Sequence, residues 1–264
     1  MATSTGLTDV ILYDTLVNYL ISMARLVESA MNRALDAVVA FDNQRTAGLP
    51  GEVFLLEPRI NEMEIVIDEH AIRLLRRGSF TDDEMRLIVA SLKITNDLER
   101  IGDIAVNIAE RVISLREMDQ ARTPEELAPM AEAVRSMVSR SLGALIFKNA
   151  DMAAQVLECD DVVDQYRDRI FENLLQHMTQ DVALVGPGMQ FILATRHLER
   201  IADHATNIAE DIIFWVRGLD VRHGRGLTLR PEQPDTTCFG SEEVTENSHA
   251  LHSDVTPACE TESA

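Results

Sequence analysis

Hydrophobic residues recur along most of this chain at intervals of three and four positions. The clearest series are Ile94, Leu98, Ile101, Ala105, Ile108, Val112 and Leu115, and Ala194, Leu198, Ile201, Ala205, Ile208, Ile212 and Trp215. This seven-residue spacing is typical of long helices that pack side by side. The whole pattern predicts six helices, over residues 8–42, 52–77, 81–118, 123–149, 151–178 and 189–217.

Local signals place several helix ends. Gly78 is expected to stop the second helix, and Thr81, followed by three acidic residues, is expected to cap the third. Pro124 fits the first position of the fourth helix. The stretch 186–188, Gly-Pro-Gly, is interpreted as a turn, and Pro58 as an early kink in the second helix.

The chain contains an internal duplication. Residues 95–110, TNDLERIGDIAVNIAE, and residues 195–210, TRHLERIADHATNIAE, agree at 11 of 16 positions. Similarity at a fixed separation indicates a repeated structural unit. We therefore predict an all-α fold of two tandem, pseudo-symmetric three-helix bundles with six long antiparallel helices, the first over 8–119 and the second over 123–218.

The last part of the chain, residues 219–264, has a different composition. It is rich in Ser, Thr and Glu and is punctuated by Gly and Pro, which predicts a disordered acidic tail. Glu246 and His249 have the spacing of a metal-ligating pair there. We interpret that spacing as a coincidence, because nothing would fix the geometry of the two side chains.

Each repeat carries the same polar residues: Glu99, Asp103, Asn107 and Glu110, and Glu199, Asp203, Asn207 and Glu210. At about 100° per residue these positions fall opposite the apolar seam, on the outside of the bundle. Carboxylates four residues apart on a helix repel each other. The stripe is therefore either a solvated surface or the site of a cation that relieves the repulsion.

Neighbouring helices offer further oxygen ligands. A shift of 103 residues aligns Glu57 and Asn61 with Asp160 and Asp164, whereas a shift of 100 instead aligns Glu64 and Asp68 with Asp164 and Asp168. Several carboxylates on one patch favour a hard cation, or iron, manganese or zinc. The candidate metal ligands are Glu99, Asp103, Glu199, Asp203, Asp160, Asp164, Glu57 and Asn61. Asn61 is neutral, so we expect weaker binding in the first repeat.

Other charged residues lie beside the stripe. His204 is either an additional ligand or, as we favour, a residue of the bundle surface. Arg100 and Arg200 occupy equivalent positions, where they either pair with the neighbouring acids or meet an anion. Simple ion pairing is the interpretation that we favour for both arginines.

Composition narrows the class of function. The formal net charge of −20 argues against nucleic-acid binding, which needs a basic surface. Three widely spaced cysteines favour a reducing compartment, and we find no signal peptide or transmembrane run. We find no phosphate-binding glycine loop and no nucleophile motif. Catalysis is therefore poorly supported.

LERIGD and LERIAD, each followed by A-x-N-I-A-E, closely resemble the repeated signature of the PhoU family over about residues 8–218. The resemblance implies surface metal, of iron, zinc, manganese or magnesium, held by Glu99, Asp103, Glu199 and Asp203 with help from Asp160 and Asp164. Glu57 and Asn61 depart from the Asp-x-x-x-Asp pattern of the family. The resemblance further implies a cytoplasmic protein, often a homodimer, that reaches the membrane only through partners.

The partners implied by the resemblance are the ATPase of the phosphate ABC transporter and a phosphate sensor histidine kinase. Through them such proteins restrain phosphate uptake and phosphate-starvation signalling. The sequence thus favours a non-enzymatic, metal-binding regulator of phosphate homeostasis. Two alternatives stay open: a carboxylate-bridged di-metal oxidoreductase and a metal-free helical scaffold.

Overall fold

The structure is a computed structural model that describes the backbone of residues 3–222 and the side chains of residues 12–222. Within this range every regular element is helical. The elements are α1 (Thr3–Val39), η1 (Gln44–Thr46), α2 (Leu49–Leu75), α3 (Asp82–Arg116), α4 (Leu127–Phe147), α5 (Ala150–Leu157), α6 (Asp160–Gln180), η2 (Val182–Leu184) and α7 (Val185–Arg217). The predicted all-α class is confirmed. The predicted tail, apart from its first four residues, lies outside the described range.

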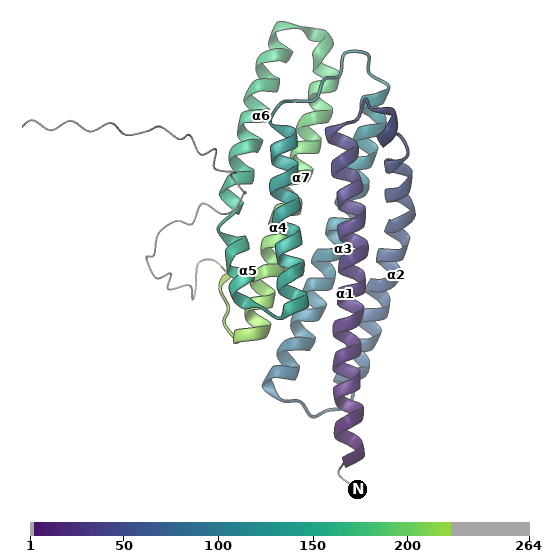
Figure 1. The fold of residues 1–264 in the computed structure, drawn as a ribbon, viewed down its shortest axis with the longest axis vertical. Coiled ribbons are helices and arrows are strands. Elements are labelled where there is room, and N and C mark those ends of the chain that lie inside the picture. The colour runs from purple at the N-terminus through teal and green to yellow at the C-terminus, as the bar shows by residue number, and fades with distance from the viewer. Residues whose placement is uncertain (1–2, 223–264) are drawn as a thin grey trace, which may run out of the picture. The chain divides into compact units, whose positions relative to one another are not determined.

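The helices pack as two groups of three long rods (Figure 1). α1, α2 and α3 contact one another, and α4 and α6 both pack on α7. The most extensive helix–helix contact joins α3 to α7, and α1 also contacts α4. The two copies of the repeated sequence therefore lie side by side at the centre of the molecule. Each copy belongs to its own three-helix group, as predicted, and the two groups meet at the α3–α7 contact.

The apolar positions that predicted the helices form the core. All seven seam residues of α3 have no exposed surface, and those of α7 are at most 9% exposed. The equivalent residues of α1, from Leu16 to Val38, are buried in the same way. Full burial of one such side chain contributes roughly 1.5–3 kcal/mol relative to leaving it in water. The three-and-four periodicity therefore determined which face of each helix turns inward.

Local backbone and side-chain interactions determine where α2 ends and where α3 begins. Gly78 adopts φ +80° in the connection from α2, a conformation that costs glycine little. The Thr81 hydroxyl accepts a hydrogen bond from the Glu84 backbone N–H, and the Glu84 carboxylate accepts one from the Thr81 N–H at 2.8 Å. This capping box satisfies two backbone donors at the helix start. The prediction of Thr81 as the cap is confirmed.

Two predictions about helix starts need correction. α4 begins at Leu127, and Pro124 lies in the connection before it. The Gly-Pro-Gly stretch is helical and forms the first turn of α7, while η2 makes the reversal from α6. Proline is tolerated there because the first backbone N–H groups of a helix have no partner within it. Gly188 lets α6 approach, since a Cβ at that position would lie 2.7 Å from the sulfur of Met178.

The predicted helix over 151–178 is two helices. α5 ends at Leu157, and α6 begins at Asp160 after Glu158 and Cys159. Asp160 and Asp161 lie in the first turn of α6, where the helix dipole favours negative charge. The break therefore concentrates two carboxylates at a helix start that faces α7.

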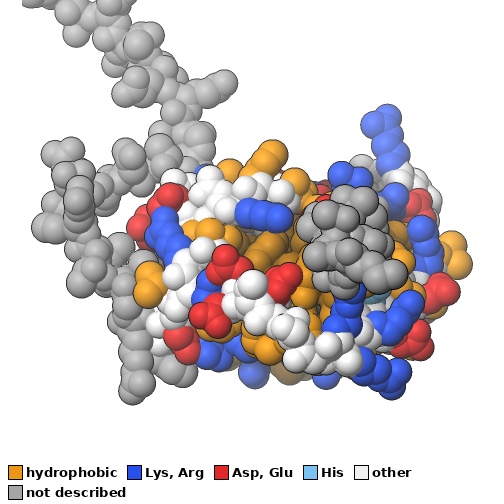
Figure 2. Space-filling view, turned by 90° about the horizontal axis from the view of Figure 1, so that it is seen from below, with side chains coloured by type: hydrophobic (Ala, Val, Ile, Leu, Met, Phe, Trp, Pro, Cys, Tyr) orange, Lys and Arg blue, Asp and Glu red, His pale blue; other side chains and the backbone are white. Residues whose placement is uncertain are grey.

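The end of the molecule with the α2–α3 connection and the last turn of α7 is seen in Figure 2. Hydrophobic side chains are visible there among charged side chains of both signs. No helix of the described residues is both long and apolar enough to cross a membrane.

Candidate metal-binding patches and the seam between the repeats

Four of the predicted ligands gather in the second repeat. Asp160 and Asp164 come from the first two turns of α6, and Glu199 and Asp203 come from the middle of α7. Burial raises the pKa of Asp160 most, followed by the negative charges of Asp203 and Asp164. Burial also raises the pKa of Asp203, with Glu199 as the next cause. We call these four residues the second acidic patch.

Arg167 is inserted into the second acidic patch. Its Nη1 atom donates to Asp164 at 2.8 Å and to Glu199 at 2.6 Å, and its guanidinium also pairs with Asp168 at 2.9 Å. The arginine side chain is 28% exposed, and its hydrogen bond to Asp168, followed by that to Glu199, raises its pKa. Sequence reasoning missed this residue. Its position three residues after Asp164, on the same helix face, was the available signal.

The first repeat has a different charge arrangement. Burial raises the pKa of Glu99 most, with the nearby Asp103 as the next cause and Glu64 as a further one. Arg100 lies 3.4 Å from Glu99 and 3.6 Å from Asp103. The Glu99 side chain is only 16% exposed, so the predicted outward stripe is partly buried at this point.

In the first repeat, two of the predicted ligands on α2 form a hydrogen bond with each other. The amide of Asn61 donates to Glu57 at 2.5 Å, and the Asn61 Oδ1 atom is buried without a partner among the described residues. Glu57, Asn61 and Glu64 are spaced by four and three residues and share one face of α2. With Glu99 and Asp103 we call them the first acidic patch.

The structure also distinguishes the two possible alignments of the repeats. Buried residues of α2 recur in α6 at positions 103 residues later, Ile60 as Val163 and Ile67 as Ile170. Asn61 is therefore the counterpart of Asp164, and Glu57 that of Asp160. The alternative shift of 100 residues does not match this placement.

The donor chemistry of the second patch fits a hard cation, since carboxylate oxygens are what such ions prefer. Burial and then repulsion between the carboxylates raise the pKa values of Asp160 and Asp203, and a cation would relieve that repulsion. Among residues 12–222, however, no three His, Cys, Asp or Glu side chains are already arranged as a metal cage. Arg167 supplies the positive charge between Asp164 and Glu199.

Two hollows accompany these features. A groove of about 350 Å³ beside the second patch is lined by Arg167, Asp168, Ile170, Phe171, Ile192, Thr195, Arg196 and Glu199. A cleft of about 690 Å³ lies between the α3–α4 connection, the end of α6 and the start of α7. Leu174, His177 and Phe191 are among the residues lining the cleft. The sequence pattern pointed to neither hollow.

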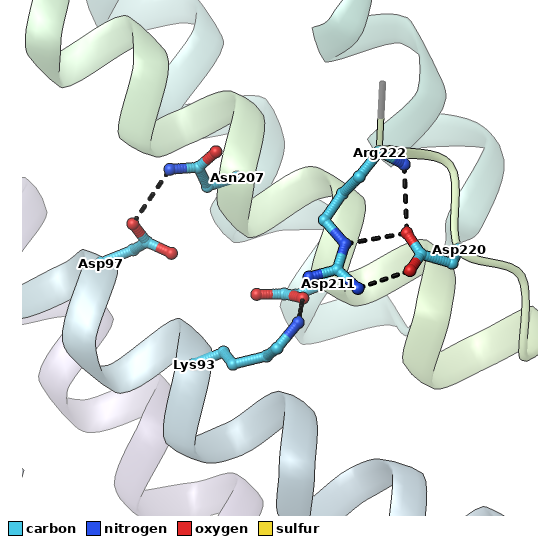
Figure 3. A network of polar contacts seen from close by, with 6 residues as sticks. All are labelled: Lys93, Asp97, Asn207, Asp211, Asp220 and Arg222. Atoms are coloured by element: carbon cyan, nitrogen blue, oxygen red, sulfur yellow. Dashed lines mark hydrogen bonds and ion pairs between the residues drawn. The ribbon is translucent and has the colours of Figure 1, made fainter. Parts of the chain in front are cut away.

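The contact between α3 and α7 carries polar residues of its own. The carboxylate of Asp97 pairs with the His204 imidazole at 2.7 Å and accepts a bond from Asn207 at 3.3 Å. Lys93 pairs with Asp211 at 2.7 Å (Figure 3). The predicted stripe is therefore not one outer surface, because Asn207 reaches across to α3. His204 is 18% exposed, and its imidazole contacts Asp97 of the other repeat.

Comparison with known proteins decides the family. The PhoU domain family matches residues 20–112 and again residues 127–212. The chain belongs to the PhoU family. The first matched region spans most of α1 to α3, and the second spans α4 to most of α7. Each long-helix group thus corresponds to one PhoU domain.

Curated PhoU relatives match most of the chain. A "Phosphate-specific transport system accessory protein PhoU homolog" from Pseudomonas aeruginosa is 38% identical over 82% of this chain and 88% of its own length. The homolog of the same description from Pseudomonas putida is 38% identical over 78% of this chain and 79% of its own length.

Solved PhoU structures have the same fold. The crystal structure of PhoU from Pseudomonas aeruginosa superposes with a TM-score of 0.75 at 35% identity, covering 79% of this chain and 99% of that one. The PhoU structure from Streptococcus pneumoniae gives a TM-score of 0.72 at 24% identity, covering 81% of this chain and 99% of that one. The second likeness concerns the fold alone.

Proposed function

We propose that this PhoU-family chain is the accessory regulator of a phosphate-specific transport system. In this role it restrains phosphate uptake and phosphate-starvation signalling, and it is not an enzyme. The observation that carries the proposal is the 38% identity, over 82% of the chain, to a curated protein described as the accessory protein of such a system. The two PhoU domains and the paired acidic patches are consistent with the same role.

The proposed partners are the ATPase of the transporter and a sensor histidine kinase, which would place the chain in the cytoplasm. A homodimer is proposed as the working form. The abundant negative charge supports binding to basic surfaces of such partners, since complementary potentials speed encounter and fix orientation.

Metal binding is a further part of the proposal. Asp160, Asp164, Glu199 and Asp203 would hold the ion, and a bound ion would supply positive charge that neutralises the patch. Iron, zinc, manganese and magnesium are the candidates. The first patch, where Asn61 replaces a carboxylate, is expected to bind more weakly. The ion pairs of Arg167 favour one alternative, a patch that works without metal.

The regulatory role is tested by deleting the gene in the source cell and growing the strain with abundant phosphate. We expect higher phosphate uptake and higher alkaline phosphatase activity, both reversed by the wild-type chain supplied in trans. Unchanged uptake and phosphatase activity in the deletion strain would contradict the role.

Metal binding is tested separately by elemental analysis and by calorimetric titration of the purified chain with Mn²⁺ and Zn²⁺. Asp203→Asn should weaken binding by about tenfold, as expected for the loss of one charged ligand. The control is Glu172→Gln on the exposed surface of α6. Equal affinity of both variants and the wild type would exclude the second patch as the site.

A further inference from the structure

The α3–α7 seam has two ends that the duplication makes equivalent. Position 97 in the first repeat corresponds to 197 in the second, and position 111 corresponds to 211. One end of the seam carries Asp97 and Asp211, whereas the other carries His197 and Arg111. Equivalent positions of the two repeats therefore make one end of the seam acidic and the other end basic.

The acidic end supplies its own counter-charges. Lys93 pairs with Asp211, and Asn207 donates to Asp97 (Figure 3). His204 also contacts Asp97. The Asp211 side chain is 9% exposed, so its pairing with Lys93 offsets the cost of burying a carboxylate. This end of the seam is complete within the chain.

The basic end lacks the equivalent counter-charges. The position matching Lys93 is Leu193, and the position matching His204 is Ile104, so no acid replaces either of them. Arg111 contacts Gln190 at 3.2 Å and Glu110 at 3.3 Å through its terminal nitrogens. Its Nε atom is buried and has no partner among the described residues. The Nδ1 atom of His197 is likewise buried and has no partner among the described residues.

Two further arginines add positive charge at this end. Arg196 and Arg200 are exposed on α7, and neither has a hydrogen bond or ion pair within residues 12–222. Burial lowers the pKa of His197 most, followed by the charges of Arg200, Arg111 and Arg196. Arg200 lies one helical turn after His197, so its charge is close to the imidazole. Glu110, the acid that opposes them in this group, is already paired with Arg111.

Helix geometry places these groups around one spot. Gln190 and His197 are seven residues apart and share a face of α7, and Arg200 lies one turn beyond His197. The contact between Arg111 and Gln190 brings the α3 side of the seam to the same face. The equivalent of Arg200 in the first repeat is Arg100, which instead lies against Glu99 and Asp103.

We propose that the basic end of the seam, formed by Arg111, His197 and Arg200 with Arg196 beside them, binds a small multivalent oxyanion of the phosphate class. Guanidinium groups present forked N–H donors that match the oxygens of such an anion. The net charge of −20 of the whole chain disfavours a long polyanion, because the chain as a whole would repel it. This inference goes beyond the proposed function and does not depend on it.

Calorimetric titration of the purified full-length chain with inorganic phosphate, at constant ionic strength, tests the proposal. Arg200→Gln should weaken phosphate binding by about tenfold, the loss expected when one charged hydrogen-bond donor is removed. Arg100→Gln, at the matched position of the first repeat, should leave the affinity unchanged. Circular dichroism and urea midpoints should show that both variants are folded.

Each other outcome would overturn the inference. Absence of phosphate binding to the folded wild type excludes the site, and equal losses in Arg200→Gln and Arg100→Gln indicate only a general charge effect. Anionic phosphatidylglycerol vesicles form a second arm of the test. Arg200-dependent binding to vesicles without binding to inorganic phosphate would identify a lipid headgroup surface in place of a small-anion site.

Discussion

The two acidic patches occupy the same place in the two repeats but balance their charge differently. In the second repeat Arg167, from α6, pairs with Asp164 and Glu199. In the first repeat the position equivalent to Arg167 is Glu64, which adds to the repulsion on Glu99. The neutral Asn61 in place of Asp164 removes one carboxylate and partly compensates.

The comparison shows where the duplicated halves have diverged. The α3 and α7 acids are the same at both sites, whereas the partner helices α2 and α6 differ in charge at two positions on one face. Because charges a few ångströms apart interact strongly when partly buried, two substitutions are enough to change how each patch responds to a cation. Four substitutions test this difference, in order of expected effect.

The largest effect is expected for Arg167→Gln. The change leaves Asp164 and Glu199 partly buried without their counter-ion, so the free energy of unfolding should fall by about 1–3 kcal/mol. Urea denaturation at neutral pH measures it. Arg169→Gln, which removes an exposed neighbour on the same helix, is the control and should have little effect. A similar loss in both variants would contradict a special role for Arg167.

Asn61→Asp should give the first patch the carboxylate that the second patch has at the equivalent position. The variant loses the amide that donates to Glu57 and adds a negative charge, so the free energy of unfolding should fall by about 1–2 kcal/mol without metal. Added Mn²⁺ should restore more stability in this variant than in the wild type. Urea denaturation with and without Mn²⁺ measures both effects. If Mn²⁺ stabilised the variant and the wild type equally, the first patch would not be a metal site.

Glu64→Arg should place the counter-ion of the second patch in the first. Removing the repulsion on Glu99 and adding an attraction should raise the free energy of unfolding by about 0.5–1 kcal/mol. The gain should shrink as salt is added, because partly exposed charges are screened. Glu62→Arg, exposed on the same helix, provides the matched control. If both variants gained equally, a general charge effect would explain the result.

The smallest expected effect is a pH-dependent change in stability caused by the titration of Asp203. Because its pKa is raised in the folded chain, the folded state holds a proton more tightly than the unfolded state. The stability contribution of this group therefore falls as pH rises from the ordinary value of 3.8 toward the raised pKa. Asp203→Asn removes that penalty.

The Asp203→Asn variant should be more stable than the wild type by roughly 0.3 kcal/mol at neutral pH, after allowance for solvent screening. The advantage should vanish below the ordinary pKa of the carboxyl. Urea midpoints measured across the acidic range check both points. A constant difference at every pH would show that titration of Asp203 is not the cause.

Sequence reasoning named the acids of the two patches but did not predict the residues around them. Repetition of Glu99 and Asp103 as Glu199 and Asp203 was visible in the chain, as was the spacing of Asp160 and Asp164. Whether Glu64 or Asn61 stands opposite a given acid depends on the axial register of α2 against α3. That register is set by core packing, for example by Ile60 against Gly102, and not by the polar pattern.

The sequence alone determined the helices, their inward faces and the duplication. Periodic apolar residues must be buried against other helices, and their spacing defines which face that is. The sequence did not determine every helix boundary. Packing against neighbouring helices decides the division between α5 and α6, and it also decides that α7 begins with the helical Gly-Pro-Gly stretch.

Only the tertiary structure decided which polar residues meet between the repeats. Packing α3 antiparallel to α7 brought Asp97 to His204 and Lys93 to Asp211, residues that lie more than one hundred positions apart. The same contact left Arg111 and His197 with buried nitrogens that have no partner in the described chain. Charge pairing depends on distance in space, and distance between distant segments is fixed by how the helices pack.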